Sequence, residues 1–128
     1  MSFNSDIEKL ARKLAITQAK AVAAFCINIS ARVERMSPVD TGLFRANWQA
    51  SLDQPYNGAV KPANRNGSID HVIPFAKQAD GHVFYLTNKL PYAKKLEYGH
   101  SQQAPNGMVR VSARLALYEL EQAVRSVQ

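Results

Sequence analysis

The chain has 128 residues, of which 46% are hydrophobic and 20% charged, so one domain can bury a core without disulfides or metals. That charged fraction is too low for a disordered polyelectrolyte. No apolar run approaches the roughly 20 residues needed to cross a bilayer, and the first residues lack the features of a secretion signal. The single cysteine, Cys26, excludes an internal disulfide and favours a reducing cytoplasm. We therefore expect one soluble domain over residues 1–128 that contacts no membrane.

The formal net charge of +6 raises the question of nucleic-acid binding. Residues 1–50 carry seven basic and four acidic side chains, residues 51–100 carry six and four, and residues 101–128 carry three and two. A nucleic-acid-binding arm would concentrate the excess in one stretch. The even spread therefore favours a modestly basic surface over such an arm.

The first predicted element is one long helix over residues 5–35. Ser5 and Glu8 match a capping box, and apolar residues then recur with a 3.6-residue period that neither Gly nor Pro interrupts. Such a helix would be roughly 45 Å long, longer than a domain of this size. Alanines on its face, including Ala19 and Ala23, would allow a neighbouring subunit to approach closely. The helix therefore indicates assembly.

Proline at position 38 ends that helix, and Asp40 is placed to cap the turn that follows. The remaining predicted elements, in chain order, are a helical turn over 43–47, a strand over 48–53, a loop over 54–67, a short helix over 69–76, a strand over 82–87, a short helix over 91–98, a loop over 100–107 and a helix over 108–126. This order predicts an α+β fold. We expect a small, mainly antiparallel sheet packed by a long N-terminal helix and a C-terminal helix.

No residue pattern points to an enzyme, a metal site or a cofactor. The histidines at 71, 82 and 100 lack the close spacing of metal ligands. A triad of Asp70, His100 and Ser101 is the kind of set that any chain of this length offers by chance, and no nucleophile elbow accompanies it. The glycines are scattered singly at turns and form no phosphate-binding loop. Capping and surface hydrogen bonds account for the polar stretch around Glu97 and His100 more simply than acid–base chemistry does.

Three tyrosines near the second predicted strand invite two interpretations. Tyr85, Tyr92 and Tyr98 are interleaved with lysines at 89, 94 and 95, a pattern that suits either base stacking with phosphate contacts or a protein interface. Tyr92 is four residues from Leu96 on a helix, so packing within the chain explains it. An interface explains Tyr98 and an exposed Tyr85 better.

Two segments resemble a known family. Residues 37–48, Ser-Pro-Val-Asp-Thr-Gly-Leu-Phe-Arg-Ala-Asn-Trp, are similar to the Pro-Val-Asp-Thr-Gly-x-x-Arg-x-x-Trp signature of small bacteriophage morphogenesis proteins. Residues 85–109 resemble the same family's second signature, in which a strand ending in Asn leads to Pro-Tyr-Ala and then Leu-Glu-Tyr-Gly. We call these segments the first and second motifs. The family comprises the tail-completion or head–tail joining (neck) proteins of long-tailed phages and prophages.

This resemblance implies a structural virion protein, assembled in the host bacterial cytoplasm. Family members are α+β domains that form a ring, usually a hexamer, at the top of the tail. The implied partners are copies of the chain itself, the head connector or adaptor proteins, and the tail tube or its terminator, with non-specific contact to DNA in the channel. A tail terminator that caps the tube is the nearest alternative. A small basic nucleic-acid-binding protein is the alternative from another class.

The resemblance carries family positions onto this chain residue by residue. They are Asp40, Thr41, Gly42, Arg45, Trp48, Asn88, Pro91, Tyr92, Glu97, Tyr98 and Gly99. We assign most of them to architecture: Asp40 to a turn cap, Trp48 to the sheet anchor. Arg45 and Glu97 carry opposite charges, which predicts a salt bridge joining the motifs, with two unrelated surface charges as the alternative. The polar loop over 100–107, with His100, is the candidate partner contact.

Overall fold

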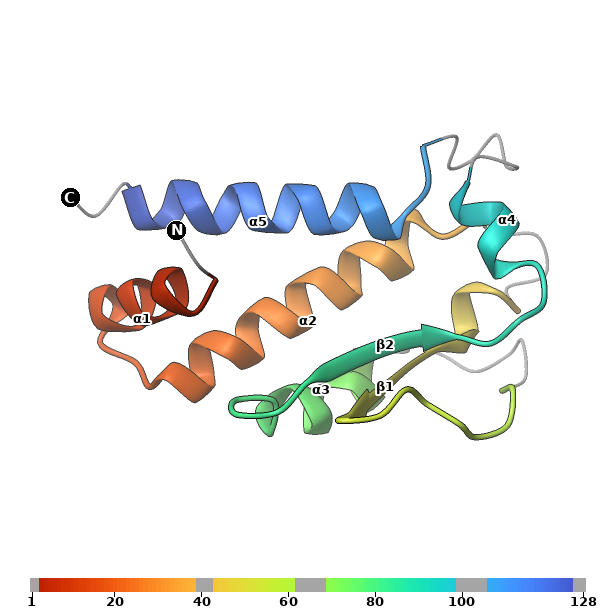
Figure 1. Cartoon of the computed structure of the whole chain (residues 1–128), viewed down its shortest axis with the longest axis horizontal. Coiled ribbons are helices and arrows are strands. Elements are labelled where there is room, and N and C mark those ends of the chain that lie inside the picture. The colour runs from red at the N-terminus through yellow and green to blue at the C-terminus, as the bar shows by residue number, and fades with distance from the viewer. Residues whose placement is uncertain (1–2, 39–42, 62–68, 99–105, 126–128) are drawn as a thin grey trace.

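The computed structural model describes residues 3–38, 43–61, 69–98 and 106–125. Within these residues it confirms the α+β class, with helices around one small antiparallel sheet (Figure 1). The elements are α1 (Phe3–Leu14), α2 (Gln18–Met36), a 3-10 turn η1 (Arg45–Asn47), β1 (Trp48–Leu52), α3 (Ile69–Lys77), β2 (Phe84–Asn88), α4 (Ala93–Glu97) and α5 (Val109–Arg125).

The predicted continuous N-terminal helix is wrong, because α1 and α2 are separate helices bent by 112°. Ala15 adopts a positive φ of 55°, which ends α1. Thr17 has extended backbone angles, and its side-chain oxygen accepts a hydrogen bond from the Lys20 N–H at 3.2 Å, which caps α2. Ser5 lies inside α1 and is not its cap. In the described part of the chain, no single helix is long and apolar enough to cross a membrane, although the bent pair together passes that test.

The bend turns the alanine face inward, against other parts of the same chain. Ala21 packs with residues of α1 and α5. Ala23 packs with Cys26 of its own helix and with Ala76 of α3. Packing of Ala23 on a neighbouring subunit is therefore excluded, and a charge at this position would disrupt the domain's own core. Ala19 is half-buried.

The sheet pairs β1 with β2 in antiparallel register, from Trp48 opposite Asn88 to Leu52 opposite Phe84. Just past β1, the Asp53 N–H donates to Val83 O at 2.7 Å, and one Asp53 carboxylate oxygen accepts from the Val83 N–H at 3.0 Å. The other carboxylate oxygen lies 2.7 Å from His82 Nδ1. The Val83 N–H, and after it the His82 ring, lower the pKa of Asp53. Asp53 thus closes this end of the sheet.

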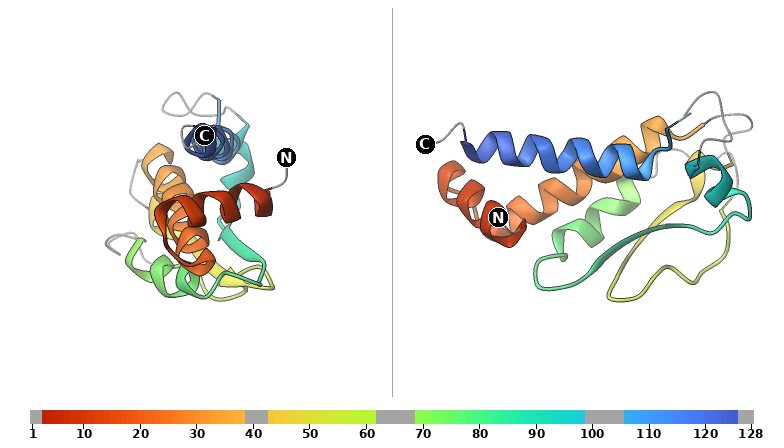
Figure 2. Two further views of the ribbon diagram at one scale, coloured as in Figure 1. Left: turned by 90° about the vertical axis from the view of Figure 1, so that its left-hand side faces the viewer. Right: turned by 45° about the horizontal axis from the view of Figure 1, so that its top comes forward.

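Helix α2 forms the middle layer of the molecule, between α5 on one side and the sheet with α3 on the other (Figure 1). The view along the long axis shows the same stacking, with α5 above α2 and α3 below (Figure 2). Helix α5 buries a stripe at four-residue spacing: Ser112, Ala116, Leu120 and Val124. The apolar Val109 and Leu117 of the same helix are 40% and 50% exposed. Helix α1 lies at one end of the molecule and α4 at the other (Figure 1).

Candidate functional site

The two motifs meet at the α4 end of the molecule. Trp48, the last residue of the first motif, is directly opposite Asn88 of the second in the sheet register. The Asn88 side-chain amide donates to Phe44 O at 2.9 Å, and its oxygen accepts from the Leu90 N–H at 3.2 Å. Asn88 thereby ends β2 and ties the two motifs together. We call this region the motif junction; its buried apolar residues are Val33, Phe44, Trp48, Leu90 and Met108.

Aromatic packing fills the motif junction. The Trp48 and Phe44 rings are 5.6 Å apart in an edge-to-face arrangement, and the Tyr92 ring lies 6.0 Å from that of Phe44. The buried Trp48 Nε1–H donates to Ser37 Oγ at 2.7 Å, and the Ser37 hydroxyl donates to Val33 O at 2.7 Å. The two ends of the first motif are therefore in contact, because Ser37, its first residue, accepts a hydrogen bond from the side-chain N–H of Trp48, its last residue.

Arg45 holds the C-terminal end of α2. Its guanidinium donates to Arg35 O at 3.0 Å and to Ser37 O at 2.9 Å, carbonyls with no acceptor role inside the helix. Glu97 pairs instead with Arg110, whose Nε lies 2.9 Å from its carboxylate. The predicted Arg45–Glu97 salt bridge is therefore wrong. Each side chain serves a nearby helix end, which charge sign alone does not reveal.

Glu97 caps the start of α5. One carboxylate oxygen accepts from the Met108 and Val109 N–H groups at 3.0 and 2.8 Å, and the other accepts from the Arg110 N–H at 3.0 Å. The Arg110 guanidinium also donates to Glu97 O at 2.6 Å. Gly107 has a φ of +86°, and a Cβ there would lie 2.4 Å from Glu97 O, so only glycine permits this approach. The second motif thus binds the helix that follows it.

The environment of Glu97 stabilises its charged form. Burial raises its pKa, but the hydrogen bonds from the Val109, Arg110 and Met108 N–H groups and from the Arg110 guanidinium outweigh burial, so the pKa lies below its ordinary value. The N-terminal end of a helix also favours a negative charge. The Glu97 carboxylate therefore has a structural role, as the ionised cap of α5.

The tyrosines lie in three different environments. Tyr98 is 59% exposed, and the Arg110 guanidinium sits 4.7 Å from its ring centroid. Tyr92 is 39% exposed beside the motif junction. Tyr85, expected to be exposed, is half-buried on β2 opposite Ser51. Tyr98 is thus the most accessible of the three.

Several predicted positions lie outside the described residues: Asp40, Thr41, Gly42, Gly99, His100 and Ser101. Pro91 is exposed and precedes α4. Sequence reasoning missed Asn47, whose side chain donates to Leu43 O and Lys61 O and accepts from the Lys61 N–H at 2.6 Å. The position of Asn47 inside the first motif is the feature of the sequence that could have identified it. It ties the segment after β1 to the motif junction.

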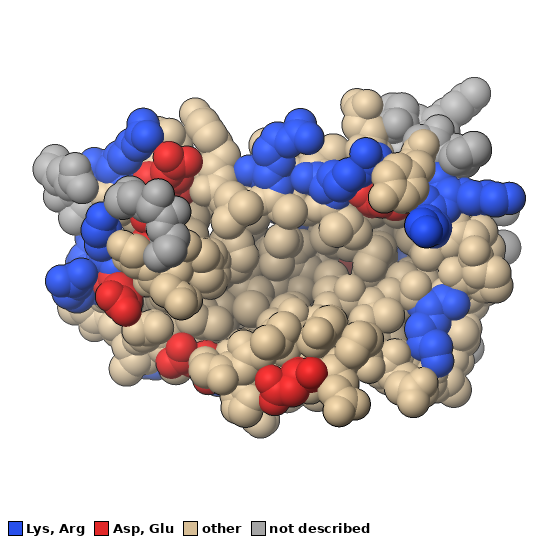
Figure 3. All heavy atoms as spheres, viewed as in Figure 1, with Lys and Arg blue, Asp and Glu red and all other residues tan. Residues whose placement is uncertain are grey.

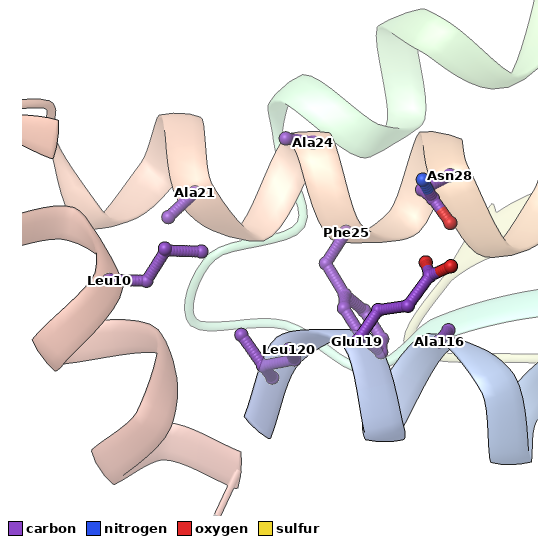
Figure 4. A pocket seen from close by; sticks show the side chains of 8 residues that line it. All are labelled: Leu10, Ala21, Ala24, Phe25, Asn28, Ala116, Glu119 and Leu120. Carbon is purple, nitrogen blue, oxygen red and sulfur yellow. The ribbon is translucent and has the colours of Figure 1, made fainter. Parts of the chain in front are cut away.

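A hollow of about 190 Å³ lies between α1, α2 and α5 (Figure 4). Small side chains such as Ala24 and Ala116 leave this space. Asn28 and Glu119 point toward one another at its edge (Figure 4), and Arg32 hydrogen-bonds to both. Its polar groups are therefore engaged with one another. In the ranges that the structure describes, no three His, Cys, Asp or Glu side chains are grouped to hold a metal ion.

No family model, no curated protein and no solved structure matches the chain. The motif residues described above act through helix capping, strand pairing and aromatic packing. In the described residues, the geometry of these contacts supports a structural role for the motif residues. An exposed surface lies beside them.

We predict that Glu97→Gln lowers the free energy of unfolding by about 2 kcal/mol at neutral pH, because a charged acceptor of backbone N–H groups is lost. Since the folded-state pKa of Glu97 is lowered, its stabilisation is complete above the ordinary pKa of 4.5 and is lost as the pH falls through the folded-state value. Urea unfolding from pH 7 to pH 3 would show the wild-type advantage shrinking at the acid end. Glu121→Gln, which removes an exposed i,i+4 pair, is the control and should change stability by less than about 0.5 kcal/mol. A pH-independent gap would contradict this role.

Gly107→Ala and Gly81→Ala form a matched pair that isolates the close approach at Glu97. Both glycines have similar positive φ values, +86° and +82°, but a Cβ at Gly81 meets nothing within 4 Å. We expect Gly81→Ala to cost about 1 kcal/mol from backbone strain, and Gly107→Ala to cost at least about 2 kcal/mol more. Equal losses in thermal or urea unfolding would show that the contact with Glu97 does not matter.

Proposed function

We propose that this chain is a structural virion protein at the head–tail interface of a long-tailed phage or prophage. It acts in tail completion, as a neck ring that joins the capsid connector to the tail during assembly. In this proposal the ring is homo-oligomeric, a hexamer, and it uses no catalysis and no cofactor. Its partners are further copies of the chain, the head connector or adaptor, and the tail tube or terminator.

The observation that carries the proposal is the convergence of the two motifs. They are separated by 36 residues in the sequence, between Trp48 and Tyr85. In the fold Trp48 pairs with Asn88, and Asn88 hydrogen-bonds to Phe44. Two signatures that resemble one family are thus parts of one unit, as expected if both are retained for a single architecture.

The surface supports a role in assembly. Tyr98 is exposed next to the motif junction, and α5 exposes Leu115, Leu117 and Tyr118 at between 42% and 58%. Large exposed apolar side chains that gather on one element are typical of protein interfaces. A ring subunit needs such surfaces for its neighbours and for the parts above and below it.

The test is electron microscopy of lysates from the parent phage in which this reading frame is stopped. The proposal predicts full heads beside separate tails of normal length, because each part assembles but the two do not join. Restoring the wild-type chain from a plasmid should recover joined particles. Tails of irregular length would favour the tail-terminator function instead, and intact infectious particles would overturn both.

A further inference from the structure

Most of the chain's net positive charge lies in the stretch of sequence that contains β2, α4 and the start of α5. Between Asp80 and Glu119 the sequence contains five basic side chains and one acidic side chain, a balance of +4 out of the total of +6. On the face shown in Figure 3, Lys and Arg side chains form a band over α4 and the neighbouring end of α5. We define the basic patch as the exposed basic residues of α4, of the position just after β2 and of the first turns of α5 that are not paired with Glu97: Lys89, Lys94, Lys95 and Arg114.

The one acidic residue in this part of the chain does not neutralise the basic patch. The Glu97 carboxylate is committed to the α5 backbone and to the Arg110 guanidinium. Within the described part of the chain, the side chains of Lys94, Lys95 and Arg114 make no hydrogen bond or ion pair. Three cations at the surface therefore keep their charge available to an outside partner.

We propose that the basic patch binds the phosphate backbone of duplex DNA. A uniform row of phosphates matches a surface on which the described residues include several free cations and no free carboxylate. Three of the four patch residues are lysines, which are depleted at protein–protein interfaces, so an acidic protein fits this surface less well. Lys89 is held in place, since its Nζ donates to Gly58 O at 3.0 Å. This inference goes beyond the proposed function and is tested on the isolated chain.

Because phosphate contacts carry no base information, binding is non-specific in sequence. Four contacts predict that log K falls with log salt concentration with a slope of about −3.6. The expected Kd lies in the micromolar range at low salt and weakens steeply toward physiological salt.

The test compares two triple variants by fluorescence anisotropy with a labelled duplex of about 20 base pairs. The patch variant is Lys94→Gln, Lys95→Gln, Arg114→Gln. The control is Arg12→Gln, Lys20→Gln, Lys77→Gln. It removes the same number of positive charges, also two lysines and one arginine, from exposed residues of α1, α2 and α3. We expect the patch variant to weaken binding at least about tenfold at low salt and to reduce the slope by about 2.7, and the control to change Kd less than about threefold.

Three outcomes would overturn the inference. One is that the wild-type chain fails to bind duplex DNA at low salt. The second is that both variants weaken binding equally, since net charge alone would then explain it. The third is that poly-glutamate of matched charge competes as effectively as unlabelled DNA, since the patch would then be a site for acidic protein. Because this test uses the isolated chain, a negative result would not contradict the proposed function, which the lysate experiment tests separately.

Discussion

The cap that Glu97 places on α5 is the contact on which the arrangement of the molecule depends. Helix α5 has to turn back across α2 after a polar segment, and its first N–H groups need acceptors. Glu97 supplies two carboxylate oxygens to three of those groups, and Gly107 lets the chain approach closely enough. Met108, held by this cap, is fully buried against the core that Trp48 also joins. The cap thus links a helix start, the second motif and the core.

Around the Glu97 cap, other residues of the motifs stabilise the α4 end of the domain. Arg45 binds the last carbonyls of α2, and Asn88 links β2 to the segment before β1. Ser37 satisfies the indole N–H of Trp48. These contacts supply partners to the end of a helix, to the segment before a strand and to a buried indole N–H. A closely connected end of this kind, with Tyr98 and lysines exposed on its surface, is what the proposed function requires of a ring subunit.

Much of the fold followed from the sequence, because its signals are local. Pro38 marked the end of α2 to within two residues, and the periodicity of α5 and the alternation at Trp48 placed those elements correctly. The break at Ala15 escaped prediction, because alanine favours helix and the apolar period continues across the bend. The partner of Glu97 also escaped it. Capping depends on which N–H groups the fold brings near, and charge sign pointed to Arg45 instead. The basic patch escaped prediction for another reason: the charge count was divided at residue 100, inside the stretch between Asp80 and Glu119 that carries a balance of +4.

If the proposed function holds, this chain is a permanent part of the virion at the junction of head and tail. The most direct measurement is immunogold labelling of purified, infectious particles with an antibody against the chain, viewed by negative-stain electron microscopy. We expect label at the neck of nearly every particle, and none on heads purified before joining that lack tails and neck. Particles that are infectious yet carry no copy of the chain, or that carry label only at the distal tip of the tail, would contradict it.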